Sequence, residues 1–94
     1  MTNVLANHRV KDYQAWKSVF DNFIDFRRAS GEKSYRILHP ANDTNNLTII
    51  FEWDSLENAE KFMNSTKLKS TMHEAGVIDA PNIQFFEEAE QGTL

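Results

Sequence analysis

The sequence predicts an α+β fold with four strands and two helical regions in the order βαββαβ, and three observations predict it. Residues 47–53 alternate between strictly apolar and mixed positions, the period of a strand packed on a core. Residues 13–26 carry an apolar stripe with spacings of three and four, which is typical of an amphipathic helix. Shorter strand-like segments flank both helical regions. These patterns indicate a sheet with helices packed against it.

The first strand is expected over residues 4–10, with His8 on its otherwise apolar face. Asp12 is then expected to cap the first helix, because its carboxylate can accept hydrogen bonds from the free amides of the first turn. Gly31 is expected to end this helix, since glycine readily takes the left-handed conformation found after a helix C-terminus. The pattern therefore predicts one long first helix.

The next two strands are expected to form a hairpin. Residues 34–39 are predicted as the second strand, residues 40–46 as a turn rich in Pro, Asn and Asp, and residues 47–53 as the third strand. Asp54 is expected to cap the second helical region, with Glu57 three residues later completing a capping-box pattern.

The second helical region is expected to be broken at residues 64–66, with a shorter helix from Lys67 to Gly76. Residues 83–88 are predicted as the fourth strand, and residues 89–94 as a frayed tail. Right-handed crossovers then give a ferredoxin-like antiparallel sheet in spatial order 4-1-3-2, with both helical regions on one face. The 94 residues are expected to form a single domain.

The third strand also indicates a partner. One of its faces is fully apolar, while the other carries Thr48, Ile50 and Glu52 and is only partly polar. Such a strand suggests that both faces of the sheet are covered. A chain of this length has a modest core, so the second cover is expected to come from another subunit.

Composition excludes several classes of protein. The net charge of −4 disfavours binding to nucleic acid. The absence of cysteine excludes disulfides and thiol chemistry. No apolar run is long enough to cross a membrane, and the N-terminus lacks the pattern of a signal peptide, so a cytoplasmic location is expected.

Three segments carry a family resemblance: HRVKDYQAW at residues 8–16, FEWDSLENA at residues 51–59 and STKLK at residues 65–69. With these segments the chain resembles the dimeric α+β barrel superfamily, which includes antibiotic-biosynthesis monooxygenases and small polyketide cyclases. The first two look like the strand-to-helix junctions of that superfamily. The resemblance implies a homodimer in which two sheets pack face to face.

The resemblance also implies a pocket inside each subunit, between the sheet and the helices. Carried over by position, its lining would be His8, Phe20, Tyr35, Ile37, Phe51, Trp53, Phe62 and Met72. For most of these residues, ordinary core packing is the alternative interpretation, because an aromatic stripe at helical spacing usually belongs to a core.

His8 is the sharpest candidate for chemistry. Burial would favour its neutral form, and a neutral imidazole can take a proton from a phenolic substrate. A core histidine bonded to a backbone carbonyl is the alternative. Tyr35 and Trp53 could donate hydrogen bonds to a ligand, or simply pack. His73 is expected at the edge of its helix's apolar stripe, facing solvent or the mouth of the pocket. No spacing of the histidines predicts a metal site.

The function expected from these features is that of a small monooxygenase-like enzyme without a cofactor, acting on a flat phenolic or quinol-like molecule. A base, His8, would generate an electron-rich anion that reacts with dioxygen directly, without metal or flavin. Two alternatives stay open. One is a non-catalytic dimer that binds a small apolar ligand or a partner, and the other is a cyclase or isomerase that uses the same pocket.

Overall fold

The computed structural model describes residues 1–94 and shows four strands and four helices. In chain order the elements are β1 (Thr2–Arg9), α1 (Tyr13–Asn22), α2 (Ile24–Ser30), β2 (Glu32–Leu38), β3 (Asn46–Trp53), α3 (Leu56–Met63), α4 (Thr66–Glu74) and β4 (Asn82–Glu87). The predicted α+β order is confirmed, with both helical regions present as pairs of helices. The strand ends lie within two residues of the predicted positions.

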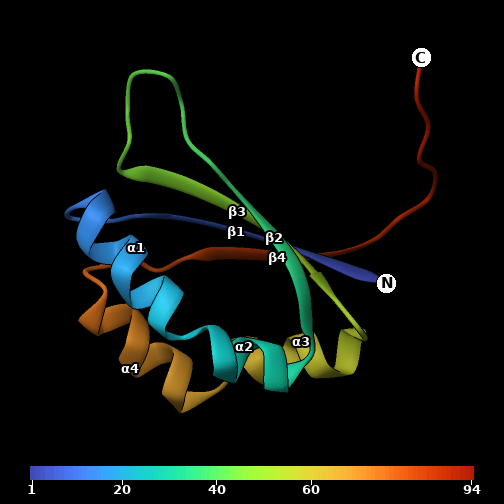
Figure 1. The fold of residues 1–94 in the computed structure, drawn as a ribbon, viewed down its shortest axis with the longest axis horizontal. Helices are drawn as coiled ribbons and strands as arrows, with labels where there is room; N and C mark the ends of the chain where they lie inside the picture. Colours follow the sequence, from blue (N-terminus) through green and yellow to red (C-terminus); the bar gives the residue numbers. More distant parts are fainter.

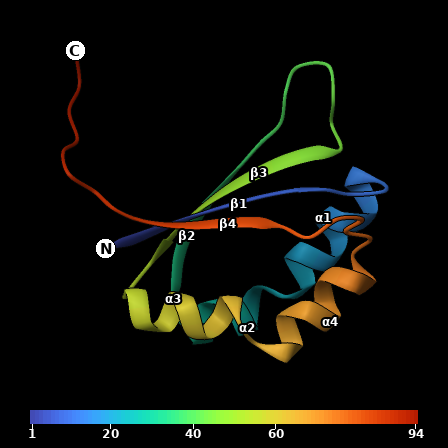
Figure 2. The ribbon, with the colours of Figure 1, turned by 180° about the vertical axis from the view of Figure 1, so that it is seen from behind.

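The four strands form one antiparallel sheet in the order β2-β3-β1-β4, which is the predicted order 4-1-3-2 viewed from the other edge. All four helices lie on one face of this sheet, and the opposite face is left without a covering element (Figure 1, Figure 2). Residues 88–94 carry no secondary structure and extend away from the sheet. No helix has the length and apolar character needed to cross a lipid bilayer.

The core lies between the sheet and the helices. Along β3, Leu47, Ile49, Phe51 and Trp53 are buried, whereas the residues between them are only partly buried. This confirms the predicted alternation. The buried face of β3 packs against aromatic and aliphatic side chains of the helices, including Trp16, Ala59, Phe62 and Met63.

The first helical region differs from the single helix that was predicted. Helix α1 ends at Asn22 and α2 begins at Ile24, because Phe23 has φ −89° and ψ 3° and interrupts the regular helix. The Phe23 ring packs within 6.0 Å of the Phe62 ring, measured between centroids, so a tertiary contact accompanies the break. Gly31 ends the region with φ +122°, as predicted.

The cap of α3 also differs from the prediction by one residue. Ser55 is the N-cap, and its hydroxyl accepts a hydrogen bond from the amide of Asn58 at 3.1 Å. Asp54 instead accepts from the side-chain amide of Asn58 and donates its backbone N–H to the carbonyl of Gly31. Asp54 therefore joins the end of β3 to the start of β2 rather than capping the helix.

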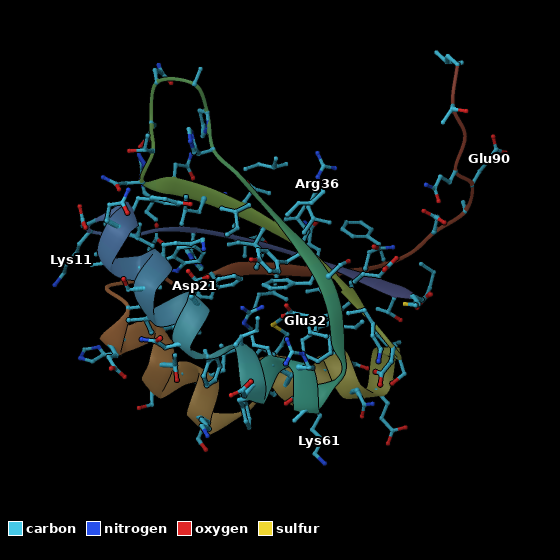
Figure 3. The ribbon with its side chains drawn as sticks, in the orientation of Figure 1. Lys11, Asp21, Glu32, Arg36, Lys61 and Glu90 are labelled. Carbon is cyan, nitrogen blue, oxygen red and sulfur yellow. The ribbon has the colours of Figure 1, made fainter.

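A bulge at the start of β2 decides on which face of the sheet Glu32 lies. Glu32 pairs with Trp53, and Ser34 pairs with Glu52, so the register shifts between them. Without the shift, Glu32 and Ser34 would share a face, because side chains alternate along a strand. The bulge turns Glu32 toward the helices, where it is buried, while Arg36 lies on the uncovered face (Figure 3).

Candidate functional site

A cavity of about 60 Å³ lies between the sheet and the helices. Its lining is mostly apolar and comes from β1, β3 and β4 and from all four helices. The side chains of His8 and Arg27 are its two strongly polar members. The cavity is therefore an apolar space with two specific polar groups, the usual composition of a small-molecule site.

Five of the eight residues predicted to line the pocket line this cavity, and three of them lie outside it, as does His73. The lining residues are His8, Phe20, Phe51, Phe62 and Met72. The residues outside it are Tyr35, Ile37, Trp53 and His73. The cavity lies between the sheet and the helices, where the pocket was expected, but Tyr35, Ile37 and Trp53 do not line it. His73 is exposed, in agreement with the expectation that it faces solvent or the mouth of the pocket.

Trp53 and Ile37 are packing residues. Trp53 is fully buried, and its ring lies 4.9 Å from the Phe62 ring between centroids. Phe62 lines the cavity, whereas Trp53 does not. Ile37 pairs with Ile49 across the hairpin and packs on the edge of the core. Both residues support the lining without reaching a ligand there.

Tyr35 and His73 lie outside the cavity for different reasons. Tyr35 is on the edge strand β2 and 39% exposed, and its ring meets Phe20 edge-on at 5.0 Å between centroids. Together with Glu32 it lines a separate depression on the surface. His73 is exposed in the last turn of α4, where the helix turns it away from the cavity that its neighbour Met72 lines.

His8 is buried, and neither ring nitrogen has a hydrogen-bond partner. Burial lowers the pKa of His8, and the carboxylate of Asp79 opposes this only in part. The imidazole is accordingly neutral near pH 7, with one nitrogen free to accept a proton and the other free to donate. An unpaired buried polar group costs about 1–3 kcal/mol, which a suitable ligand would offset.

The second polar group is an ion pair that the sequence analysis missed. The guanidinium of Arg27 donates to the buried carboxylate of Glu32 and, at 3.2 Å, to the carbonyl oxygen of Phe20. Burial raises the pKa of Glu32 to about 7, although Arg27 acts in the opposite direction. The Nε of Arg27 is buried without a partner. The inward turn of Glu32 depends on the bulge in β2, which has no clear sequence signal. Arg27 continues the helical spacing of Trp16, Phe20 and Phe23.

An aromatic wall connects the two polar groups. Trp16 and Phe20 are stacked, with 4.9 Å between centroids and 21° between planes. His8 meets Trp16 edge-on at 5.9 Å, and the Arg27 guanidinium lies 3.8 Å from the Phe20 centroid. His8, Trp16, Phe20 and Arg27 therefore contact one another in this order along the cavity, with a neutral imidazole at one end and a cation at the other.

This arrangement suits a flat, apolar ligand with oxygen atoms. The wall can stack with rings, His8 can remove a proton, and Arg27 can stabilise negative charge. No group of three or more histidine, aspartate or glutamate side chains is placed to hold a metal ion.

Comparison with solved structures places the fold in a class: small ferredoxin-like α+β proteins named as antibiotic-biosynthesis monooxygenases and oxygenases. One such structure is SnoaB from Streptomyces nogalater, a cofactor-independent oxygenase. It has a TM-score of 0.77 and 13% identity, over 96% of this chain and 94% of that chain. At this level of identity the likeness establishes the fold alone.

Two further solved structures share this fold. A protein from Nitrosomonas europaea, whose assignment as an antibiotic biosynthesis monooxygenase is itself provisional, has a TM-score of 0.71 and 14% identity, over 96% of this chain and all of that chain. A conserved protein from Methanosarcina mazei has a TM-score of 0.71 and 16% identity, over 93% of this chain and 91% of that chain. No family model matches the sequence. No curated protein matches it either.

Proposed function

We propose that this protein is a cofactor-independent monooxygenase-like enzyme that acts on a flat phenolic or quinol-like molecule in the cavity beside His8. One observation carries the proposal: a buried imidazole with both nitrogens unpaired lines an apolar cavity next to an aromatic wall. The similarity in fold to a cofactor-independent oxygenase supports the reaction class.

In the proposed reaction His8 takes a proton from the bound substrate and leaves an electron-rich anion. The anion reacts with dioxygen directly, which needs no cofactor. For a methylene flanked by aromatic rings, one oxygen atom of O₂ becomes the new carbonyl oxygen and the other leaves as water. The neutral state of His8 suits this role, because only the unprotonated imidazole is a base.

The cavity must widen before it can hold such a substrate. Its volume of about 60 Å³ is below the few hundred that ligand pockets usually have. Among the four helices that line the cavity, α4 is the one without a buried residue, so it is the least firmly packed of them. Its Met72 has a flexible side chain that adapts readily to a ligand. We infer that the substrate enters by displacing α4.

Oxygen uptake in the presence of an anthrone-type substrate tests the proposal. The wild-type protein should consume dioxygen faster than the uncatalysed solution, and H8Q should lower that rate by about 10²- to 10⁴-fold, the usual contribution of a general base. H73Q is the matched control, because His73 is exposed and outside the cavity. Its rate should equal that of the wild type.

The alternatives give different results. Unchanged turnover in H8Q would remove His8 as the base. Substrate binding without oxygen uptake or any new product would support a non-catalytic binding protein. A product formed without oxygen uptake would support a cyclase or isomerase that uses the same cavity.

We also propose that the protein is a homodimer that associates through the uncovered face of its sheet. This face carries Leu5 and Ile50 side by side, with exposed Leu38 and Phe86 near its two edges. An apolar patch on a surface that no helix covers is typical of an interaction site. A second copy of the same sheet would match it in shape and in polarity.

A further inference from the structure

The connection between α4 and β4 lies against the end of β1, the strand that carries His8 (Figure 2). The backbone N–H of Ile78 donates a hydrogen bond to the carbonyl oxygen of Arg9 at 3.0 Å. The backbone N–H of Lys11 donates to the carbonyl oxygen of Gly76 at 2.9 Å. These two bonds fix the connection next to His8.

Asp79 adds a third contact between this connection and β1, through its side chain. Its carboxylate accepts a hydrogen bond from the backbone N–H of Arg9 at 3.0 Å. That nitrogen is bonded to the carbonyl carbon of His8, so the carboxylate oxygen lies within about 6 Å of the Cα atom of His8. The side chain of Arg9 pairs with Asp43 instead, and Asp79 is in no ion pair. The negative charge of Asp79 is therefore free to act on His8.

The elements packed around His8 otherwise present almost no charge to it. On α1 the Trp16 ring meets His8 edge-on, and Tyr13 contacts Trp16 without lining the cavity. The side chains from β3, β4 and α4 that line the cavity are all uncharged. Arg27 is the one charged residue of the lining besides His8 itself, and two stacked rings separate it from the imidazole. Burial lowers the pKa of His8, and Asp79 is the charge that raises it.

We propose that Asp79 is a positioning residue for the reaction, whose carboxylate stabilises the imidazolium that forms when His8 takes the proton of the substrate. This inference rests on the proposed function and adds to it a residue outside the cavity. In this step the bond from the substrate's carbon or oxygen to its hydrogen breaks, and the electron pair stays on the substrate. The proton bonds to the unprotonated ring nitrogen of His8. A buried imidazolium is unfavourable without a counter-charge, and the carboxylate fixed beside it offsets part of this cost.

An NMR titration of the His8 ring in the protein without substrate is the first test, with H8Q to identify the signal. D79N keeps a side-chain oxygen that can accept the hydrogen bond from Arg9 and removes only the charge. We expect D79N to lower the pKa of His8 further. The difference from the wild type should shrink in about 1 M salt, because Asp79 is exposed. D21N, which removes an exposed carboxylate paired with Lys17, should leave the titration of His8 unchanged.

Oxygen uptake with the anthrone-type substrate is the second test. At pH 7 we expect kcat/KM of D79N to be about 2- to 5-fold lower, the size of effect that an exposed charge usually has, because a less basic imidazole takes the proton less readily. The acid limb of the profile of kcat/KM against pH should move to lower pH, since His8 stays neutral further down. A merely structural defect would lower kcat/KM at every pH without moving this limb. D21N should match the wild type.

The outcomes separate this inference from the proposed function. Identical titrations of His8 in D79N and the wild type would overturn the role of Asp79, and so would a lower kcat/KM with an unmoved acid limb. A lower pKa with unchanged oxygen uptake would also overturn it, because Asp79 would then have no part in the reaction. If the wild type consumes no oxygen while D79N lowers the pKa of His8, the monooxygenase is rejected and the stabilisation of the imidazolium by Asp79 is confirmed.

Discussion

At the scale of single residues, the site depends on two titratable groups that burial affects in different ways. Burial lowers the pKa of His8 and raises that of Glu32, and in both cases it favours the neutral form. His8 was identified from the sequence because it interrupts an apolar strand face. Glu32 was not, since it follows the helix-ending Gly31 in a segment whose register only the folded sheet reveals.

The raised pKa of Glu32 predicts a pH dependence of stability. Its pKa is about 7 in the folded protein and 4.5 in the unfolded chain, so between these values the folded state binds more protons. The free energy of unfolding contributed by Glu32 is thus fully present below pH 4.5 and is lost as the pH rises through 7. E32Q should remove this loss, which has a slope of up to about 1.4 kcal/mol per pH unit.

Denaturant unfolding of wild type and E32Q from pH 4 to pH 8 measures this slope. The difference between the wild-type and E32Q curves of unfolding free energy against pH isolates the effect of Glu32. The lowered pKa of His8 acts in the opposite direction, because the stability contributed by His8 is present above pH 6.5 and is lost as the pH falls. The unpaired Arg27 in E32Q adds a constant to the difference in unfolding free energy. The effect of Glu32 is therefore measured by the slope of that difference against pH. A flat difference would show that Arg27 keeps the carboxylate ionised.

At the scale of elements, short-range signals located the helices well, and tertiary contacts decided their details. Asp12 caps α1 as predicted, with its carboxylate accepting from the amide of Ala15 at 2.9 Å. The break at Phe23 was missed, because neither proline nor glycine marks it. At α3 Asp54 was predicted as the cap, whereas Ser55 is the N-cap and Asp54 donates its backbone N–H to the carbonyl of Gly31.

This assignment of the cap is testable. S55A should lower the free energy of unfolding by about 1 kcal/mol, since it leaves the Asn58 amide without its partner. S18A, at an exposed serine inside α1, is the matched control and should change stability little. Chemical denaturation measures both. Equal losses in the two variants would show that Ser55 does not act as the cap.

At the scale of the whole molecule, the sheet has one face under the helices and one face open. The open face is only partly polar, and Ile50 lies at its centre between Leu5 and Arg36 on the neighbouring strands. The same alternation along β3 that fills the core therefore places apolar side chains on the uncovered side. This is the physical reason to expect a second copy there.

The proposed dimer predicts a clear effect of one substitution. The wild-type protein should sediment as a dimer at micromolar concentration, and I50K should sediment as a monomer, because the substitution places a charge in the centre of the interface. I78K is the control, since Ile78 is 54% exposed and lies outside the sheet. A monomeric wild type, or a dimeric I50K, would contradict association through this face.

The local pattern of the sequence was sufficient for the fold and for the buried face of each central strand. Period-two and period-3.6 patterns report burial directly. The resemblance to the dimeric α+β barrel superfamily implied a pocket lined by His8, Phe20, Phe51, Phe62 and Met72, and these five residues line the cavity. The pattern could not decide which core residues reach the cavity and which, like Trp53, lie behind others. The pairing of Arg27 with Glu32 required the tertiary structure, because the strand bulge that turns Glu32 into the interior is visible only in the folded sheet.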